Sequence, residues 1–566
     1  CRVRICRAVI RSSQPSKADS QSCRLAQRLP ASYACTAIFR ARLHATSSAK
    51  NFGNEIDGGN NSEPVLKYLR LFFLLVFVAG CSGLSPFSGP DQTTPPPVTK
   101  GIWGEIETIR TQDWQVPLNE GTAALEWRLR AIDSAQQSID LQSFIWSFDR
   151  VGSVIHDRLL AAANRGVAVR ILIDDSFLLG EDQHLLELHR HENVQYRVYN
   201  PYKRRTSGAA SRLMLNLGEF HRLDHRMHNK TMVVDNQVAI VGGRNLADAY
   251  FGFDGSFNFR DMELLVGGPV VEDVSRSFDQ YWNDRWSFPI DEIARIRTSH
   301  VEKSAISSKA SDLSKRFPTE TTDGRNAAWR STVRNSFAGQ ARIVVDDPPR
   351  DTPQSLSDRP LRVAQELIRQ IATAREEIVI VSAYLVPTPP LRDALRDAAE
   401  RGVRVRLLTN SINSNNHIAA YAAYKNHIRE LLGFGSDVHE VRTFAQTRAL
   451  YIIPPILRKN LGLHAKYMII DGQRLIVGSS NLDPRSLRIN TEIVLMVDSP
   501  PLSQTLMALT EPDFRRTNAW QLSLDQDGTI LWLGEDGLVL RNEPASSAFQ
   551  RLEEWFFAHL PIEDEI

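Results

Sequence analysis

The chain has 566 residues, of which 42% are hydrophobic and 23% charged, a composition typical of a globular protein long enough for two domains. Its formal net charge is +1, but residues 1–80 contain 12 basic and 4 acidic side chains, which leaves 55 against 62 in residues 81–566. A body with this acidic balance lacks the basic surplus of a typical nucleic-acid-binding protein, so we expect no nucleic-acid partner.

The five cysteines all lie at or before position 81. The body therefore cannot form a disulfide or a thiolate metal site. Residues 1–66 are rich in Arg and Ser, and no methionine precedes Met214. We expect residues 1–66 to be upstream sequence outside the functional protein, or disordered.

Residues 67–81 have the pattern of a secretory signal. Lys67 and Arg70 precede an apolar run over 71–79, and the run ends in Val78-Ala79-Gly80-Cys81. This segment resembles a lipoprotein signal peptide with its lipobox, which implies acylation of Cys81. The resemblance places the protein in a bacterial cell envelope, lipid-anchored on the periplasmic side. Ser82 after the cysteine favours the outer membrane.

Residues 82–102 contain five prolines among Ser, Thr and Gly. Such a composition favours extended chain without a core of its own. We expect this segment to be a tether that holds the body away from the membrane.

Two stretches of the body repeat with the same spacing. Residues 165–172 (RGVAVRIL) recur as 401–408 (RGVRVRLL), 236 positions later, and an H-x-K-x4-D pattern recurs at the same offset. Two matches in one register indicate duplication of a whole domain. We expect a first domain over 103–296, a linker or insertion over 297–340, and a second domain with a C-terminal extension over 341–566.

Each half shows the same alternation of helix and strand patterns. Apolar periodicity and β-branched runs predict helices over about 121–136 and 151–164, with strands over 139–145 and 167–173. The second half repeats this order with helices over about 360–374 and 391–400, and strands over 378–384 and 403–408. This order predicts an α/β fold of two tandem domains related by a pseudo-twofold axis.

The repeated motif brings together residue types suited to phosphoryl chemistry. On a strand, residues two apart face the same side, so His228 and Lys230 are predicted to point into one site, as are His464 and Lys466. The motifs end at Asp235 and Asp471, and each is followed by small residues and an amide. The remaining candidates from this pattern are Gly243, Asn245, Ser479 and Asn481.

Displacement at a phosphodiester needs a nucleophile, an acid for the leaving oxygen, and positive charge for the phosphoryl oxygens. Two histidines can supply the nucleophile and the acid, while two lysines and two asparagines bind the oxygens without a metal. Since each motif has one histidine, we expect the active site to lie at the interface between the halves.

The motifs resemble the phospholipase D superfamily signature H-x-K-x4-D-x6-G-S-x-N. The second copy matches fully through Ser479, whereas the first has Gly243 in place of the serine. The resemblance also implies an acidic residue downstream of each motif that orients the histidine of that motif. Asp261 occupies this place in the first half and Glu492 in the second.

A closer likeness links residues 105–565 to the bacterial cardiolipin synthase C-like phosphatidyltransferases. It extends over Arg226–Lys230, 242–252 and 481–486. The likeness implies transfer of a phosphatidyl group between phospholipids, commonly with phosphatidylglycerol as substrate, through a phosphohistidine and without a metal or other cofactor. Among two-motif members, the resemblance favours His228 as nucleophile and His464 as acid. Hydrolysis by phospholipase D is the alternative, and a nuclease or a non-enzymatic envelope protein fits less well.

Two segments before the motifs place basic residues beside apolar ones. Residues 203–205 (KRR) and 213–215 (LML) precede the first motif, and residues 451–459 precede the second. Such segments suit a rim that enters an anionic membrane surface. Loops that fold back over the core are an equally good interpretation of the same pattern.

Overall fold

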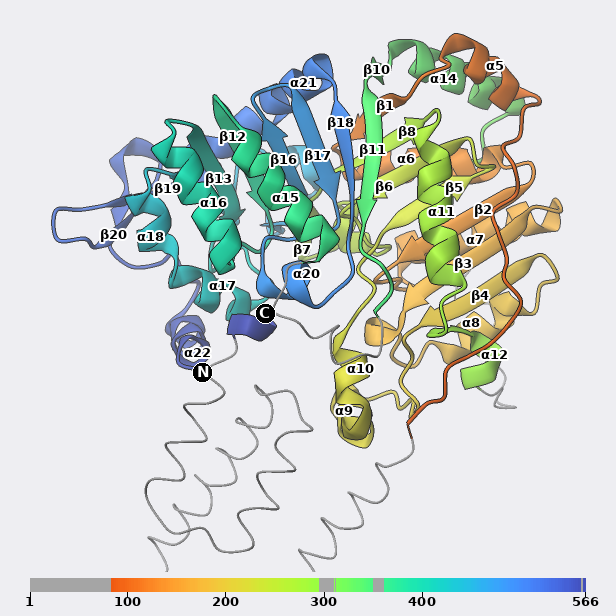
Figure 1. Ribbon diagram of the computed structural model, residues 1–566, viewed down its shortest axis with the longest axis horizontal. Coiled ribbons are helices and arrows are strands. Elements are labelled where there is room, and N and C mark those ends of the chain that lie inside the picture. The colour runs from red at the N-terminus through yellow and green to blue at the C-terminus, as the bar shows by residue number, and fades with distance from the viewer. Residues whose placement is uncertain (1–82, 295–309, 311, 350–360, 561–562) are drawn as a thin grey trace, which may run out of the picture.

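The computed structural model describes residues 83–294, 310, 312–349, 361–560 and 563–566. Two mixed α/β halves lie side by side (Figure 1). The predicted signal peptide and Cys81 lie outside the described residues. Among those residues, no helix is both long and apolar enough to cross a bilayer.

The first half is built on a nine-stranded sheet in which β2, β3 and β4 are parallel and the other pairings are antiparallel. In spatial order the strands are β10 (Phe337–Ala338), β1 (Trp114–Leu118), β8 (Glu263–Gly267), β6 (Val238–Gly242), β5 (Thr231–Val234), β2 (Ser138–Ser143), β3 (Ala168–Asp174), β4 (Val194–Tyr199) and β9 (Ser287–Pro289).

The second half repeats this topology in a ten-stranded sheet. The strands are β11 (Gln340–Val345), β18 (Ile493–Asp498), β17 (Arg474–Gly478), β16 (Lys466–Ile470), β12 (Glu377–Ser382), β13 (Arg404–Asn410), β14 (Asp437–Val441), β19 (Ala519–Leu524), β20 (Ile530–Leu533) and β21 (Val539–Leu540). The order β8-β6-β5-β2-β3-β4 corresponds to β18-β17-β16-β12-β13-β14, which confirms the duplicated α/β fold.

Helices cover both sheets (Figure 1). Those of the first half are α5 (Ile102–Ile109), α6 (Gly121–Ser134), α7 (Arg150–Asn164), α8 (Asp182–His189), α9 (Ala209–Leu215), α10 (Phe220–Asp224), α11 (Val270–Trp282), α12 (Ile290–Ile293) and α14 (Thr322–Asn335). Those of the second are α15 (Arg362–Thr373), α16 (Pro389–Glu400), α17 (Ile418–Lys425), α18 (Ile428–Gly433), α19 (Arg448–Tyr451), α20 (Pro484–Arg488), α21 (Pro500–Thr510) and α22 (Ala548–Ala558).

Local signals account for the ends of the repeated helices. The Asp149 carboxylate accepts a hydrogen bond from the Gly152 N–H at 3.0 Å and caps α7. Gly166 and Gly402 follow α7 and α16 with φ values of 92° and 84°, a conformation that glycine adopts without the strain of a side chain. The chain then turns into β3 and β13 at equivalent positions.

A continuous apolar core joins the two halves. It contains Val233 and Met262 from the first half and Val379, Tyr467 and Leu495 from the second, all buried. Two β-strands, β7 (Phe257–Arg260) and β15 (Asn460–Leu463), also pair in parallel across this boundary. The halves are therefore held together by burial of apolar surface and by backbone hydrogen bonds.

Two connecting segments are more structured than their composition indicated. Within 297–340, residues 322–335 form helix α14, whose Trp329 is fully buried beside Trp103 and Trp127. The described part of the tether, from Gly83 onward, is extended but lies against the first half. Its Val98 N–H donates to the Asp235 carbonyl at 3.1 Å and its Thr94 N–H to the Asp279 carboxylate, so the tether prediction was wrong for this described stretch.

Candidate active site

The two motif histidines were predicted to lie on strands, but His228 lies three residues before β5 and His464 two residues before β16. Both are tied to the opposite half. The His228 N–H donates to the Thr491 carbonyl at 2.9 Å, and the His464 N–H donates to the Arg260 carbonyl at 2.8 Å. Both imidazoles are almost fully buried, at 7% and 5% exposure. The backbone itself therefore brings the two motifs to one interface.

The orienting carboxylates are exchanged between the halves. Nδ1 of His228 lies 2.9 Å from both carboxylate oxygens of Glu492, and Nδ1 of His464 lies 2.6 Å from Oδ2 of Asp261. The sequence interpretation had paired each acid with the histidine of its own half, and that pairing was wrong. Each half supplies the acid for the other half's histidine, and the two contacts are reciprocal, as in a twofold interface.

This arrangement leaves Nε2 of each ring to face a substrate. Burial lowers the pKa of His228 to about 4 and that of His464 to about 3, although the neighbouring carboxylates oppose the shift. Both imidazoles are therefore neutral near pH 7, with Nδ1–H donated to a carboxylate and a lone pair on Nε2. A neutral Nε2 is the form that can attack phosphorus or accept a proton.

The two lysines supply positive charge next to the rings. Lys230 Nζ donates to the His228 carbonyl at 2.6 Å, and Lys466 Nζ donates to the His464 carbonyl. Burial lowers the pKa of Lys230 to about 7 and that of Lys466 to about 8. An anion entering the site would offset the cost of burying these ammonium groups, so the site is suited to a phosphodiester.

The difference between Gly243 and Ser479 follows from the lengths of the two acids. The Ser479 hydroxyl donates to Glu492, whereas a Cβ at position 243 would collide with Oδ1 of Asp261. Because Asp is one methylene shorter than Glu, its carboxylate lies closer to the backbone. Glycine at position 243 therefore leaves room for Asp261, whereas Ser479 in the second half contacts Glu492.

The two asparagines lie beside the motifs. Oδ1 of Asn245 accepts a hydrogen bond from the Ile145 N–H at 3.2 Å. Oδ1 of Asn481 is buried and has no hydrogen-bond partner among the described residues. A bound substrate hydroxyl could supply the donor that this amide oxygen lacks.

Asp235 and Asp471 were predicted as catalytic residues, but the structure places them outside the site. Both occupy turns with φ near 53° and 52°, at the far ends of β5 and β16. Asp235 accepts hydrogen bonds from the Gln136, Gln137 and Ser138 N–H groups at 2.7–2.8 Å. Asp471 does the same for the N–H groups of residues 375–377. They fix the start of the neighbouring strand.

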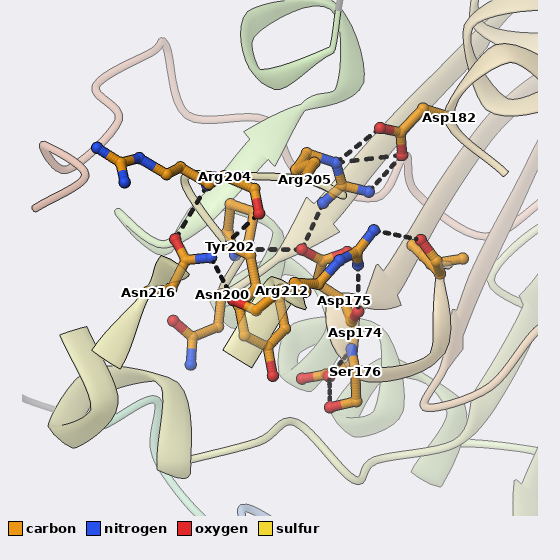
Figure 2. Close-up of polar contacts among 12 residues, drawn as sticks. Asp174, Asp175, Ser176, Asp182, Asn200, Tyr202, Arg204, Arg205, Arg212 and Asn216 are labelled. Carbon is orange, nitrogen blue, oxygen red and sulfur yellow. Dashed lines mark hydrogen bonds and ion pairs between the residues drawn. The ribbon is translucent and has the colours of Figure 1, made fainter. Parts of the chain in front are cut away.

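Sequence reasoning missed a polar network at the end of β3, which Figure 2 shows around Asp174 and Asp175. Asp174 ends β3 and accepts the Met227 N–H at 3.0 Å, directly before His228. The next residue, Asp175, receives hydrogen bonds from the Tyr202 N–H at 2.7 Å and from the buried guanidinium of Arg205. The available signal was the pair of acids directly after the strand predicted over 167–173, because the carboxyl ends of strands in α/β sheets commonly carry functional groups.

The predicted membrane rim is divided by the structure. Arg205 is buried and paired with Asp175 and Asp182, so it cannot face an anionic surface. Leu213, Met214 and Leu215 are exposed, as the rim interpretation requires. In the second segment Tyr451 and Ile452 are buried whereas Leu457 is 79% exposed. Burial of Tyr451 and Ile452 agrees with the core-covering interpretation for that part, and a membrane contact of the exposed residues stays a prediction.

Comparison with known proteins agrees with this geometry. The family model described as "Cardiolipin synthase, PLD-like domain" matches residues 129–282 and 367–513, one copy in each half. Cardiolipin synthase C of Escherichia coli K12 is 33% identical over 463 residues, covering 79% of this chain and 95% of that protein. Cardiolipin synthase B of the same organism is 26% identical over 387 residues, covering 67% and 74%.

Among solved structures, a phosphatidylserine synthase from Haemophilus influenzae Rd KW20 has the same fold, with a TM-score of 0.52 and 14% identity. The alignment covers 82% of this chain and 100% of that one. Three findings lead to one conclusion: two matched domain copies, relatives that align over nearly the whole body, and the paired His and Lys residues. The chain is a cardiolipin synthase-like enzyme that belongs to the phospholipase D superfamily.

Proposed function

We propose that this enzyme transfers a phosphatidyl group from one phospholipid to the hydroxyl of another, with phosphatidylglycerol as substrate and cardiolipin as product. The observation that carries the proposal is the pair of buried histidines, each held by a carboxylate of the other half and each beside a lysine. The similarity to cardiolipin synthase C supports the choice of substrate.

In the first step, Nε2 of His228 attacks phosphorus and the bond from phosphorus to the headgroup oxygen breaks. The leaving oxygen takes the electron pair and a proton from Nε2 of His464. That step needs His464 to be protonated, and the negative charge of the bound phosphodiester raises the pKa of His464 above its value in the free enzyme. Lys230 and Lys466 stabilise the charge on the phosphoryl oxygens. The assignment of His228 as nucleophile follows the resemblance to two-motif members, because the two histidines have nearly equivalent surroundings.

In the second step, the hydroxyl of the acceptor lipid loses its proton to Nε2 of His464 and attacks the phosphohistidine. The P–N bond breaks, and Nε2 of His228 recovers its lone pair. With water as acceptor, the same steps give phosphatidic acid. Product analysis therefore distinguishes transfer from hydrolysis.

The test incubates the purified chain with labelled phosphatidylglycerol and separates the lipid products. We expect cardiolipin and glycerol, and no product from His228→Ala or His464→Ala. Phosphatidic acid as the sole product would replace transfer with hydrolysis. With a substrate whose leaving group needs no proton, His464→Ala should still form a phosphohistidine on His228. An adduct on His464 in the His228→Ala variant would reverse the roles.

We further propose that the enzyme is anchored through an acylated Cys81 on the periplasmic side of a bacterial envelope, in the outer membrane. The support is the sequence Val78-Ala79-Gly80-Cys81-Ser82 after an apolar run. Cys81→Ala should abolish labelling by a fatty-acid analogue, with Ser82→Ala as the control. Unchanged labelling of the Cys81→Ala variant would refute the anchor.

A further inference from the structure

Two short helices expose apolar side chains at the same edge of the molecule (Figure 1, lower edge). On α9 and the turn after it, Met214 is 69% exposed, and Leu213, Leu215 and Leu217 are exposed as well. On α22, one face carries Phe549, Leu552, Trp555 and Phe556, with Phe549 73% exposed. Clusters of this size on a protein surface usually mark a binding partner.

The two helices are attached at equivalent places in the duplicated fold. The Arg212 guanidinium of α9 donates to the Leu178 carbonyl at 3.1 Å and fixes α9 to the loop after β3. Gln550 Nε2 of α22 donates to the Ile412 carbonyl at 2.9 Å and fixes α22 to the loop after β13. Since β3 and β13 correspond, each half carries one apolar helix beyond the end of the same strand.

Both loops lead to the active site. The His228 ring lies 4.9 Å from the ring of Phe144, which lies 5.4 Å from Phe177 in the loop after β3. Phe177 is itself 54% exposed, so aromatic rings connect His228 with the surface next to α9. In the second half, Nδ2 of Asn410 at the end of β13 donates to the Leu463 carbonyl at 2.8 Å, directly before His464. The chain after β13 then leads to α17, the helix on which α22 packs.

The start of the described chain lies at this edge too. The Lys203 ammonium, in the loop before α9, donates to the Gly83 carbonyl at 3.1 Å. Gly83 is two residues after Cys81 in the sequence. An anchor at Cys81 would therefore be attached close to α9.

We propose that α9 and α22 form a membrane-docking face that inserts its apolar side chains into a phospholipid bilayer on both sides of the active-site entrance. Trp, Phe, Leu and Met at the ends of two protrusions suit the interfacial region of a bilayer, where apolar and polar surroundings meet. This proposal rests on the proposed function for the identity of the partner, because a lipid substrate has to enter from a bilayer.

The test uses the full-length chain bound to vesicles of phosphatidylglycerol and phosphatidylethanolamine. Of the ten tryptophans, all within the described residues, Trp555 is the exposed one, at 57%. Brominated acyl chains should quench Trp555 fluorescence, and Trp555→Phe should remove the quenched component. Hydrogen exchange should slow in 209–219 and 548–558 but not in the β20–β21 hairpin. If the chain sedimented with the vesicles but showed neither quenching of Trp555 nor slower exchange in 209–219 and 548–558, the proposal would be overturned.

Kinetics add a second readout. Phe549→Ser/Trp555→Ser should lower kcat/KM on vesicle lipid about tenfold and leave turnover of a monomeric short-chain phospholipid unchanged. The control pair Leu538→Ser/Val539→Ser also removes exposed apolar groups, from the hairpin, and should change neither. If the chain has no activity on any lipid, the proposed function fails. Quenching of Trp555 then still shows whether α22 inserts into the bilayer. Protection of α9 and α22 that depends on protein concentration without vesicles would instead indicate a second copy.

Discussion

At the scale of single residues, Glu492 and Asp261 determine the state of histidines in the opposite half. In Glu492→Gln the amide cannot balance an imidazolium or fix the tautomer, and we expect kcat/KM to fall about 10–100-fold. NMR of ¹⁵N-labelled histidine should show a changed Nδ1 environment for His228 and an unchanged one for His464. Asp261→Asn should give the reverse result, and a change at the histidine of the same half would contradict the exchange.

The lysines predict a specific dependence on pH. Lys230 has a pKa of about 7 and Lys466 of about 8 in the free enzyme, so each loses its proton as the pH rises through these values. Loss of positive charge weakens attraction for the phosphodiester, and kcat/KM should decline above about pH 7. In the complex the substrate anion favours the charged form of both lysines, so kcat should begin to decline at a higher pH than kcat/KM does. If kcat/KM and kcat declined over the same pH range, this explanation would be refuted.

At the scale of elements, Asp235 and Asp471 hold strand starts in place. Asp235→Ala removes the acceptor of three backbone N–H groups and of the buried Trp103 indole, which should lower the free energy of unfolding by about 2–4 kcal/mol. Asp471→Ala should cost less because residues 375 and 376 are exposed. Urea unfolding measures both losses. The folded variants should keep their kcat, and a large drop in kcat at full stability would restore a catalytic role.

The elements also show what the sequence could predict. The helix expected over about 121–136 is α6 at Gly121–Ser134, and the strand expected over 403–408 is β13 at Arg404–Asn410, because apolar periodicity is a local signal that occurs twice here. Helix α14 was missed because its face is largely polar and Trp329 is its main anchor. The partner of His228 was missed because Glu492 is 264 residues away in the chain, and spacing carries no information about contacts across an interface.

At the scale of the whole molecule, the active site exists only when both halves are docked. A half expressed alone has one motif histidine and lacks the acid that orients it. Its apolar interface, which in the first half includes Val233 and Met262, would be exposed. Halves 103–340 and 341–566 should each be inactive as monomers, and co-expression should restore turnover. Light scattering would establish the mass of each species, and turnover by a monomeric half would defeat the expectation.

The exchanged carboxylates also have a consequence for inheritance. In a duplicated gene, one copy is normally free to decay or to acquire a new role while the other keeps the original one. Here a substitution at Asp261 takes effect at His464, and one at Glu492 takes effect at His228, so each copy carries a part that the other needs. Neither copy can be lost, or replaced by the equivalent half of a relative with a different acid, without a matching change in its partner. Within each copy the residue beside the acid suits the length of that acid, since Ser479 contacts Glu492 and Gly243 leaves room for Asp261.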